Sequence, residues 1–208
     1  MLRFVTPPYL YRAFYSDLVW NMDAVEKTIY LTFDDGPTPN VTEQVLNLLK
    51  AHQAKATFFC LGKNVKENPE LFQSILNHGH AIGNHTYSHV NGWNASLDTY
   101  LEDVDKCSEL VQSKLFRPPY GKLKPSQRDH LLNKFKIIMW SVLSYDFDTG
   151  VYPEICWNYV KENTKAGSVI VFHDSLKAKQ NLLFALPRLL EHYSKQGYTF
   201  KSIESERN

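Results

Sequence analysis

The chain has 208 residues, with 23 basic and 22 acidic side chains and a formal net charge of +1. This length suits one folded domain, and near-zero charge removes the broad electrostatic attraction to nucleic acid or anionic membranes. The three cysteines (Cys60, Cys107 and Cys156) include no C-x-x-C pair, which argues against a disulfide framework or a cysteine-rich zinc ribbon.

The first 20 residues, MLRFVTPPYLYRAFYSDLVW, do not have the pattern of a signal peptide. Pro7 and Pro8 interrupt the apolar run, and no A-x-A cleavage site follows. No apolar run is long enough for a membrane-spanning helix. We therefore expect an N-terminal extension over residues 1–25, a main domain over 26–208 and a cytoplasmic location, with export by an unrecognised route as the alternative.

From residue 28 onward, short β-type runs alternate with helical patterns. Strands are expected at 28–33, 56–61, 80–84, 115–116, 136–142, 167–172 and 198–200. Helices are expected after Thr38, from Pro69, after Ser96, and at 125–135, 153–163 and 182–194, the last with Pro187 as a break or a new first turn. The alternation predicts an α/β fold with a parallel sheet covered by helices.

Six or seven such units in this length predict a single-domain, distorted or incomplete (β/α)7 barrel, with a doubly wound open sheet as the competitor. Unusual polar residues follow the predicted strands: Asp34, Asp35, His85, Arg117, Asp146 and His173. In a barrel, the carboxyl ends of all strands converge on one face, whereas in an open sheet they spread along an edge. The placement of these residues therefore favours the barrel.

Two of the strand ends carry groups that suit a metal site. In Thr32–Pro37 (TFDDGP), two adjacent carboxylates repel each other, so at least one needs a partner. In His85–His89 (HTYSH), two imidazoles four residues apart reach one metal if the stretch is helical. Taken singly, the first motif is as readily a surface turn, and the second a pair of loop histidines. The nearby His78 and His80 are interpreted as solvated.

Two further strand ends carry groups that suit acid–base chemistry. In Arg117–Gly121 (RPPYG), two prolines fix the direction of Arg117, which can clamp a carboxylate with two hydrogen bonds. The alternative is a turn with a surface arginine. In Val171–Asp174 (VFHD), a histidine directly after a buried strand can donate protons near neutral pH, or it can form a local cap with Asp174.

The four motifs in this order resemble those of the polysaccharide deacetylases of carbohydrate esterase family four, from about Thr28 to Phe200. The resemblance implies a distorted (β/α)7 barrel, one divalent metal ion, usually zinc, and a catalytic domain over 26–208. It also implies the role of each motif residue: Asp35, His85 and His89 as metal ligands, Asp34 as general base held by Arg117, the Tyr120 backbone N–H in the oxyanion hole, and His173 as general acid.

One family motif is altered. The family's Asp-x-x-Asp-Trp reads Leu-Ser-Tyr-Asp-Phe here, so Leu143 replaces the first Asp and Phe147 the Trp, while Asp146 is kept. The first Asp is thought to tune the acid histidine. Asp146 or Asp148 can substitute for it, or His173 lacks a carboxylate partner and has a lower pKa. Phe147 can still form a wall of an acetyl pocket.

The leading hypothesis is metal-dependent hydrolysis of acetyl groups, mainly N-linked, on an oligo- or polysaccharide. Trp93 is a candidate sugar-stacking surface, with a structural tryptophan as the equal alternative. An O-acetyl esterase and a non-catalytic carbohydrate-binding relative are the competing functions, and the Leu143 substitution motivates both. No nucleic-acid partner is expected, and the sequence leaves the oligomeric state open.

Overall fold

The computed structural model describes residues 3–23 and 26–204. The strands are β1 (Thr28–Asp34), β2 (Ala56–Cys60), β3 (Ala81–Asn84), β4 (Leu115–Phe116), β5 (Lys136–Ile137), β6 (Val142–Leu143), β7 (Val169–His173) and β8 (Thr199–Phe200). The helices are α1 (Tyr9–Phe14), α2 (Thr42–Ala51), α3 (Gly62–Glu67), α4 (Pro69–Asn77), α5 (Leu97–Ser108), α6 (Pro125–Leu132), α7 (Pro153–Asn163) and α8 (Lys179–Ser194), with a 3-10 turn η1 (Pro119–Gly121).

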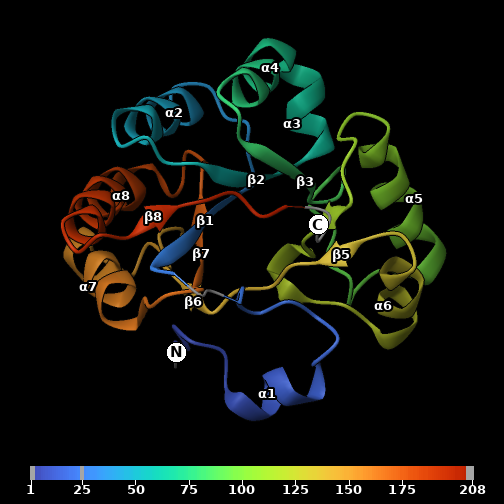
Figure 1. Ribbon diagram of the computed structural model, residues 1–208. Coiled ribbons are helices and arrows are strands. Elements are labelled where there is room, and N and C mark those ends of the chain that lie inside the picture. The colour runs from blue at the N-terminus through green and yellow to red at the C-terminus, as the bar shows by residue number, and fades with distance from the viewer. Residues whose placement is uncertain (1–2, 24–25, 205–208) are drawn as a thin grey trace.

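Seven strands form a curled, open parallel sheet in the order β5-β4-β3-β2-β1-β7-β6, and β8 pairs with the start of β1. Helices α2 to α8 surround the sheet, and α1 lies at the rim between α6 and α7 (Figure 1). This half-barrel confirms the predicted distorted (β/α)7 barrel in one domain. No helix in residues 3–23 and 26–204 is both long and apolar enough to cross a bilayer.

The central strands are buried on both faces, as expected for parallel strands between a packed interior and a layer of helices. Phe33 on β1 stacks with Phe58 on β2 at 5.0 Å and with Phe172 on β7 at 6.2 Å between ring centroids. Fully burying one such ring stabilises a fold by roughly 1.5–3 kcal/mol. The same register places Asp34 beside Phe59 and His173, so the packed phenylalanines fix where the first polar residues emerge.

The predicted strand over 136–142 is wrong as one element. Its first part, β5, pairs with β4, whereas its last part, β6, pairs with β7 at the opposite end of the sheet. The N-terminal segment lies between these edges: Val19 bridges Ile138 in parallel and Asn21 bridges Ser168 in antiparallel orientation. The apolar run is continuous in sequence because both halves are buried, but the sheet is interrupted between them.

Other local differences have simple causes. Helix α2 begins at Thr42 and not near Thr38, since residues 39–41 form a turn with Asn40 at φ 63°. Helices α1 and α3, which have six residues each, were not predicted from the sequence pattern. Helix α8 continues through Pro187 without a break. The predicted cap is confirmed, because the Ser96 side chain accepts a hydrogen bond from the Thr99 N–H at 3.2 Å.

Candidate functional site

The carboxyl ends of β1, β3, β4 and β7 converge on a cavity of about 580 Å³. The cavity brings together most of the residues that the motifs predict. Its lining consists of Asp34, Asp35, His85, His89, Pro118, Tyr120, Gly121, Lys122, Trp140, Leu143, Phe147, Val171, His173, Ser175 and Lys177. Arg117 lies behind this surface, fully buried, and Trp93 does not belong to the lining.

Asp35, His85 and His89 form a cluster whose ligand atoms all lie within 4.8 Å of one another. The two Nε2 atoms approach Asp35 Oδ1 at 3.6 and 3.2 Å, yet this buried oxygen has no hydrogen-bond partner among the described residues. The His85 Nδ1 lies 2.7 Å from the Arg117 carbonyl, and the His89 Nδ1 lies 3.1 Å from the Tyr120 hydroxyl. Partners at Nδ1 leave Nε2 of each ring directed at a common point, the arrangement that metal-ligating histidines adopt.

Burial alone would raise the pKa of Asp35, but the neighbouring His173, His85 and His89 lower the pKa below its usual value. Burial, together with the charge of His85, lowers the pKa of His89 to about 4. Asp35 is therefore ionised and His89 neutral near pH 7, which are the forms that bind a cation. A buried Asp35 oxygen without a hydrogen-bond partner, with two imidazole nitrogens directed at it, fits a divalent metal ion.

The His85–His89 segment is a loop, so the helical condition in the sequence-based argument is not met. Thr86 and His89 both have positive φ, at 66° and 61°, which brings the two rings together without a helix. Asp103 on α5 holds this loop by accepting bonds from the Tyr87 N–H and the Ser88 N–H, both at 2.9 Å. The placement of the two histidine rings thus depends on a carboxylate from a separate helix.

Asp34 and Arg117 form a buried ion pair, with Nη1 donating to Asp34 Oδ1 at 2.7 Å. The expected two-bond clamp is wrong, because one guanidinium nitrogen contacts the carboxylate and the other donors bind elsewhere. They donate to the Thr32 hydroxyl and to the Ile138 and Met139 carbonyls. The alternative of a surface arginine is excluded by complete burial. The pair fixes the Asp34 carboxylate through Oδ1, while Asp34 lines the cavity.

His173 has a carboxylate partner although Leu143 occupies the family's first Asp position. The His173 Nδ1 lies 2.7 Å from Asp146 Oδ1, and the His173 backbone N–H donates to Asp146 Oδ2 at 2.7 Å. Burial opposes protonation, but the charge and hydrogen bond of Asp146 outweigh it and raise the pKa of His173 to about 9. The other candidate, Asp148, pairs with Arg3. Of the alternatives that the sequence left open, substitution by Asp146 is therefore confirmed, and the unpartnered histidine with a lower pKa is wrong.

Three other predicted residues lie around this centre. Phe147 packs its ring edge against His173, with 4.8 Å between centroids, and lines the cavity. Tyr120 has φ 59°, and its side chain is 59% exposed. Trp93 is 54% exposed, which fits both a sugar-stacking surface and a partly buried structural tryptophan, and its ring lies under the Lys122 ammonium at 4.8 Å. Its role in stacking sugars stays a prediction.

Asp174 supports the site, whereas the sequence suggested only a local cap with His173. Its carboxylate is fully buried, accepts from the Gly36 N–H at 3.1 Å and from the Thr42 hydroxyl at 2.5 Å, and so holds the turn that follows Asp35. Burial raises the pKa of Asp174 to about 8. Gly36 is required here because a Cβ would collide with this carboxylate. His80, interpreted as solvated, is 7% exposed.

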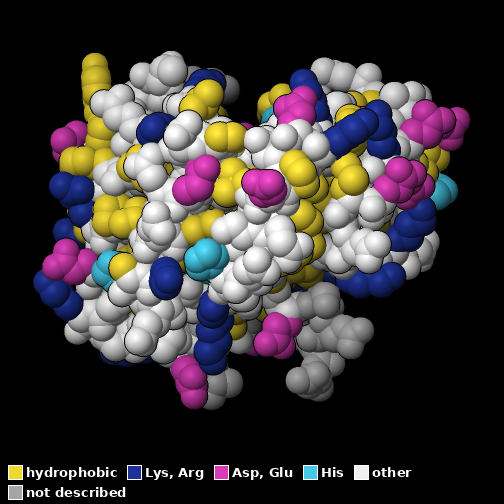
Figure 2. All heavy atoms as spheres, turned by 90° about the horizontal axis from the view of Figure 1, so that it is seen from above, with side chains coloured by type: hydrophobic (Ala, Val, Ile, Leu, Met, Phe, Trp, Pro, Cys, Tyr) yellow, Lys and Arg dark blue, Asp and Glu magenta, His cyan; other side chains and the backbone are white. Residues whose placement is uncertain are grey.

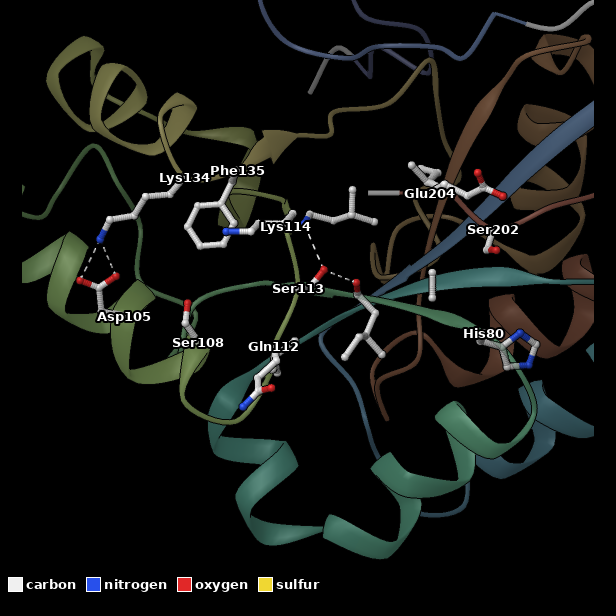
Figure 3. Close-up of a pocket in the computed structure, with 15 residues that line it drawn as sticks. His80, Asp105, Ser108, Gln112, Ser113, Lys114, Lys134, Phe135, Ser202 and Glu204 are labelled. Atoms are coloured by element: carbon white, nitrogen blue, oxygen red, sulfur yellow. Dashed lines mark hydrogen bonds and ion pairs between the residues drawn. The ribbon is translucent and has the colours of Figure 1, made fainter. Parts of the chain in front are cut away.

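A second cavity of about 890 Å³ opens near the amino ends of β3 and β4. Figure 3 shows two of its polar side chains bonded to near neighbours: Lys134 pairs with Asp105 at 3.1 Å, and Ser113 donates to the Ile82 carbonyl at 2.6 Å. Within residues 3–23 and 26–204, Asp35, His85 and His89 form the one group of three or more potential ligands. The chemistry of the described fold therefore lies in the cavity at the carboxyl ends.

Comparison with known proteins identifies the family of this chain. The family profile "Polysaccharide deacetylase" matches residues 21–135, and the chain belongs to the polysaccharide deacetylase family. A peptidoglycan-N-acetylglucosamine deacetylase of Bacillus cereus is 35% identical over 195 residues, covering 89% of this chain and 91% of that protein. A chitooligosaccharide deacetylase of Azorhizobium caulinodans is 35% identical over 158 residues, covering 72% of this chain and 74% of that protein.

A solved structure is similar over nearly the whole chain. It is a peptidoglycan N-acetylglucosamine deacetylase in complex with 4-naphthalen-1-yl-N-oxidanyl-benzamide. Its TM-score is 0.88 at 32% identity, and the match covers 97% of this chain and 100% of that one. The fold of the half-barrel is thus shared along its full length, including the segments outside the profile match.

Proposed function

We propose that this chain is a metal-dependent hydrolase that removes N-linked acetyl groups from an oligo- or polysaccharide. The main support is that one cavity holds three groups: a cluster of three potential metal ligands, the Asp34 carboxylate paired with Arg117, and His173 paired with Asp146. A carboxylate base and a protonated acid on either side of a cation are what amide hydrolysis requires, since water must lose a proton and the amine must gain one.

Asp35, His85 and His89 would hold the ion, and two imidazoles with one carboxylate suit Zn²⁺. A divalent ion there supplies Lewis acidity, which polarises a carbonyl and lowers the pKa of water. Asp34 accepts the proton of the water whose oxygen attacks the acetyl carbon. Arg117 fixes the direction of the Asp34 carboxylate, because the guanidinium is itself held by three further acceptors.

The developing oxyanion accepts a hydrogen bond from the Tyr120 backbone N–H. One well-placed donor of this kind stabilises the transition state by about 3–4 kcal/mol. His173 donates its proton to the sugar nitrogen as the carbon–nitrogen bond breaks, which releases acetate and a free amine. Asp146 fixes the ring and stabilises its protonated form. Leu143 and Phe147 line the cavity and supply the apolar surface that an acetyl methyl group prefers.

The test is acetate release from defined substrates: N-acetylglucosamine oligomers, peptidoglycan fragments and acetylxylan, with and without a chelator, and with mass detection of the sugar that changes. We expect release from N-acetylated glycans, loss with the chelator, and recovery with added Zn²⁺. Asp34→Asn should still bind the ion but lose nearly all turnover, since Asn cannot accept the proton.

The same panel separates the alternatives. Release from acetylxylan alone would indicate an O-acetyl esterase. Glycan binding with no acetate from any substrate, in protein loaded with metal, would indicate a binding protein and overturn the proposal. An Asp34→Asn variant with most of its activity would overturn the assignment of the base while leaving the reaction class standing.

A further inference from the structure

Two lysines line the active-site cavity in addition to the residues used above. Lys122 follows η1 after β4, and Lys177 lies in the turn after β7. In the sheet, β4 and β7 lie on opposite sides of β1, the strand that carries Asp34 and leads into Asp35. The two ammonium groups therefore reach the cavity from two sides of the metal cluster.

Neither lysine side chain forms a hydrogen bond or an ion pair with a described residue; each instead lies over an aromatic ring. The Lys122 ammonium is 4.8 Å from the Trp93 ring centroid, and the Lys177 ammonium is 5.9 Å from that of Phe147. Such contacts hold an aliphatic stem along a ring while the ammonium stays available to solvent or ligand. The cavity thus has two cations that form no ion pair with a described carboxylate, although the charge of Lys177 is felt by Asp35 and Asp148 at longer range.

The remaining charges of the cavity balance in pairs. Asp34 is paired with Arg117, and Asp146 with His173. Asp35 is the one remaining acid in the lining, against two lysines, and a divalent ion at the cluster would add further positive charge. The chain as a whole has a formal charge of +1, so this local excess is not the overall composition of the protein. Figure 2 shows basic and acidic side chains interspersed on one face, without a single-sign block.

We propose that the cavity selects acetamido sugars with a carboxylate substituent, and that Lys122 and Lys177 bind this anion. The inference rests on the proposed deacetylase function and refines its substrate class. A neutral glycan leaves both ammonium groups without a partner, whereas a carboxylate on or beside the reacting sugar forms a charge-assisted hydrogen bond with either. Exposed pairs of this kind are worth about a two- to fivefold effect for each lysine.

The experiment uses one tetrasaccharide of alternating N-acetylglucosamine and N-acetylmuramic acid in two forms. One has the free lactyl carboxylate and the other the neutral methylamide, so only charge differs. In a third form, a short peptide on the lactyl group moves the carboxylate to the peptide terminus. This form distinguishes a carboxylate on the sugar itself from one on an attached peptide. The measured quantity is the ratio of kcat/KM for the acid to that for the methylamide.

Wild type should prefer the acid, and the preference should shrink as ionic strength rises from about 0.01 to about 1 M. Lys122→Met and Lys177→Met should each reduce the preference for the acid glycan. The double variant should bring the ratio of the two kcat/KM values close to one. Lys→Arg at either position should keep the preference. The matched control is Lys63→Met, since Lys63 is exposed on α3, pairs with Glu67 and is absent from the lining.

A wild-type ratio of one at low salt, or a ratio that the double Met variant leaves intact, overturns the inference. If no form releases acetate, the proposed function fails instead. In that case, calorimetric titration gives the Kd of the acid glycan and the Kd of the methylamide glycan. The ratio of these two Kd values tests the lysine proposal, because binding needs no turnover.

Discussion

Arg117→Met tests the buried charge pair on which the proposed base depends. The Arg117 side chain is completely buried and donates to Asp34, the Thr32 hydroxyl and two backbone carbonyls. Methionine fills similar space but leaves Asp34, whose side chain is 5% exposed, as an unpaired buried carboxylate. Removing one partner of a buried ion pair costs about 3–5 kcal/mol, a large share of the roughly 5–15 kcal/mol that stabilises a domain.

The assay is the free energy of unfolding from urea titration at neutral pH. The control is Arg128→Met, because Arg128 contacts Asp17 and Asp129 at the surface, where such pairs contribute about 0–1 kcal/mol. In an Asp34→Asn background, Arg117→Met should cost less by about 1–3 kcal/mol, since no buried charge is left behind.

An Arg117→Met cost similar to that of Arg128→Met would refute the reasoning. It would mean that Asp34 finds another partner, such as water, without penalty once the guanidinium is removed. Equal costs of Arg117→Met in the wild-type and Asp34→Asn backgrounds would refute the charge argument specifically and leave a packing effect alone.

Three further predictions concern the rest of the fold and the metal cluster. Burial lowers the pKa of His80 from 6.5 to about 4, so the contribution of His80 to stability is present above about pH 6.5 and is lost as pH falls to about 4. This contribution is at most about 3 kcal/mol. The loss of unfolding free energy at low pH should be smaller in His80→Gln, and a pH curve identical to that of the wild type would contradict the prediction. Gly36→Ala should lower the free energy of unfolding by about 1–3 kcal/mol through collision with Asp174, and should lower Tm accordingly. Gly150→Ala, whose methyl would meet only the ends of surface side chains, should leave Tm nearly unchanged. Zn²⁺ added to metal-free protein should raise the unfolding free energy by about 2.7 kcal/mol at 100 times Kd, and a shift that survives in His89→Ala would remove this residue from the ligand set.

The alternation of strands and helices was predictable because both faces of the central strands are buried, which makes them continuous apolar runs bounded by turn residues. The run at 136–142 shows where this signal stops. Burial is the same on both sides of the break, and what separates β5 from β6 is a bridge from Val19, more than a hundred residues away in sequence. A local pattern contains no information about a contact of that range.

The types of residue at the site were predictable from their position at strand ends, but their partners were not. Nothing in Leu143–Phe147 says which carboxylate turns back to His173. That choice depends on the loop, where Tyr145 has φ 56° and the Ser144 side chain accepts from the Asp146 N–H at 3.3 Å. Leu143 stands where the family motif has an Asp, yet His173 still has a carboxylate partner in Asp146.

The backbone at the site explains why the supporting residues matter as much as the motifs. Asp35, Thr86, His89 and Tyr120 all have positive φ, a conformation that costs a non-glycine residue of order 1–3 kcal/mol in sparsely populated regions. Such a conformation persists only where surrounding contacts fix it. Asp103 bonds the loop that carries His85 and His89, and the Asn64 side chain donates to the Asp35 carbonyl at 2.7 Å.

Asp174 and Asn84 have the same role on either side of the cluster. Asp174 holds the Gly36 N–H, and Asn84 Oδ1 accepts from the Thr86 N–H at 2.8 Å while its amide donates to the Val104 carbonyl on α5. In sequence these are ordinary Asp and Asn residues at strand ends. Their function lies in which backbone groups they meet, so the reactive groups can be read from the motifs, whereas the geometry that makes them reactive is set by side chains that the motifs do not single out.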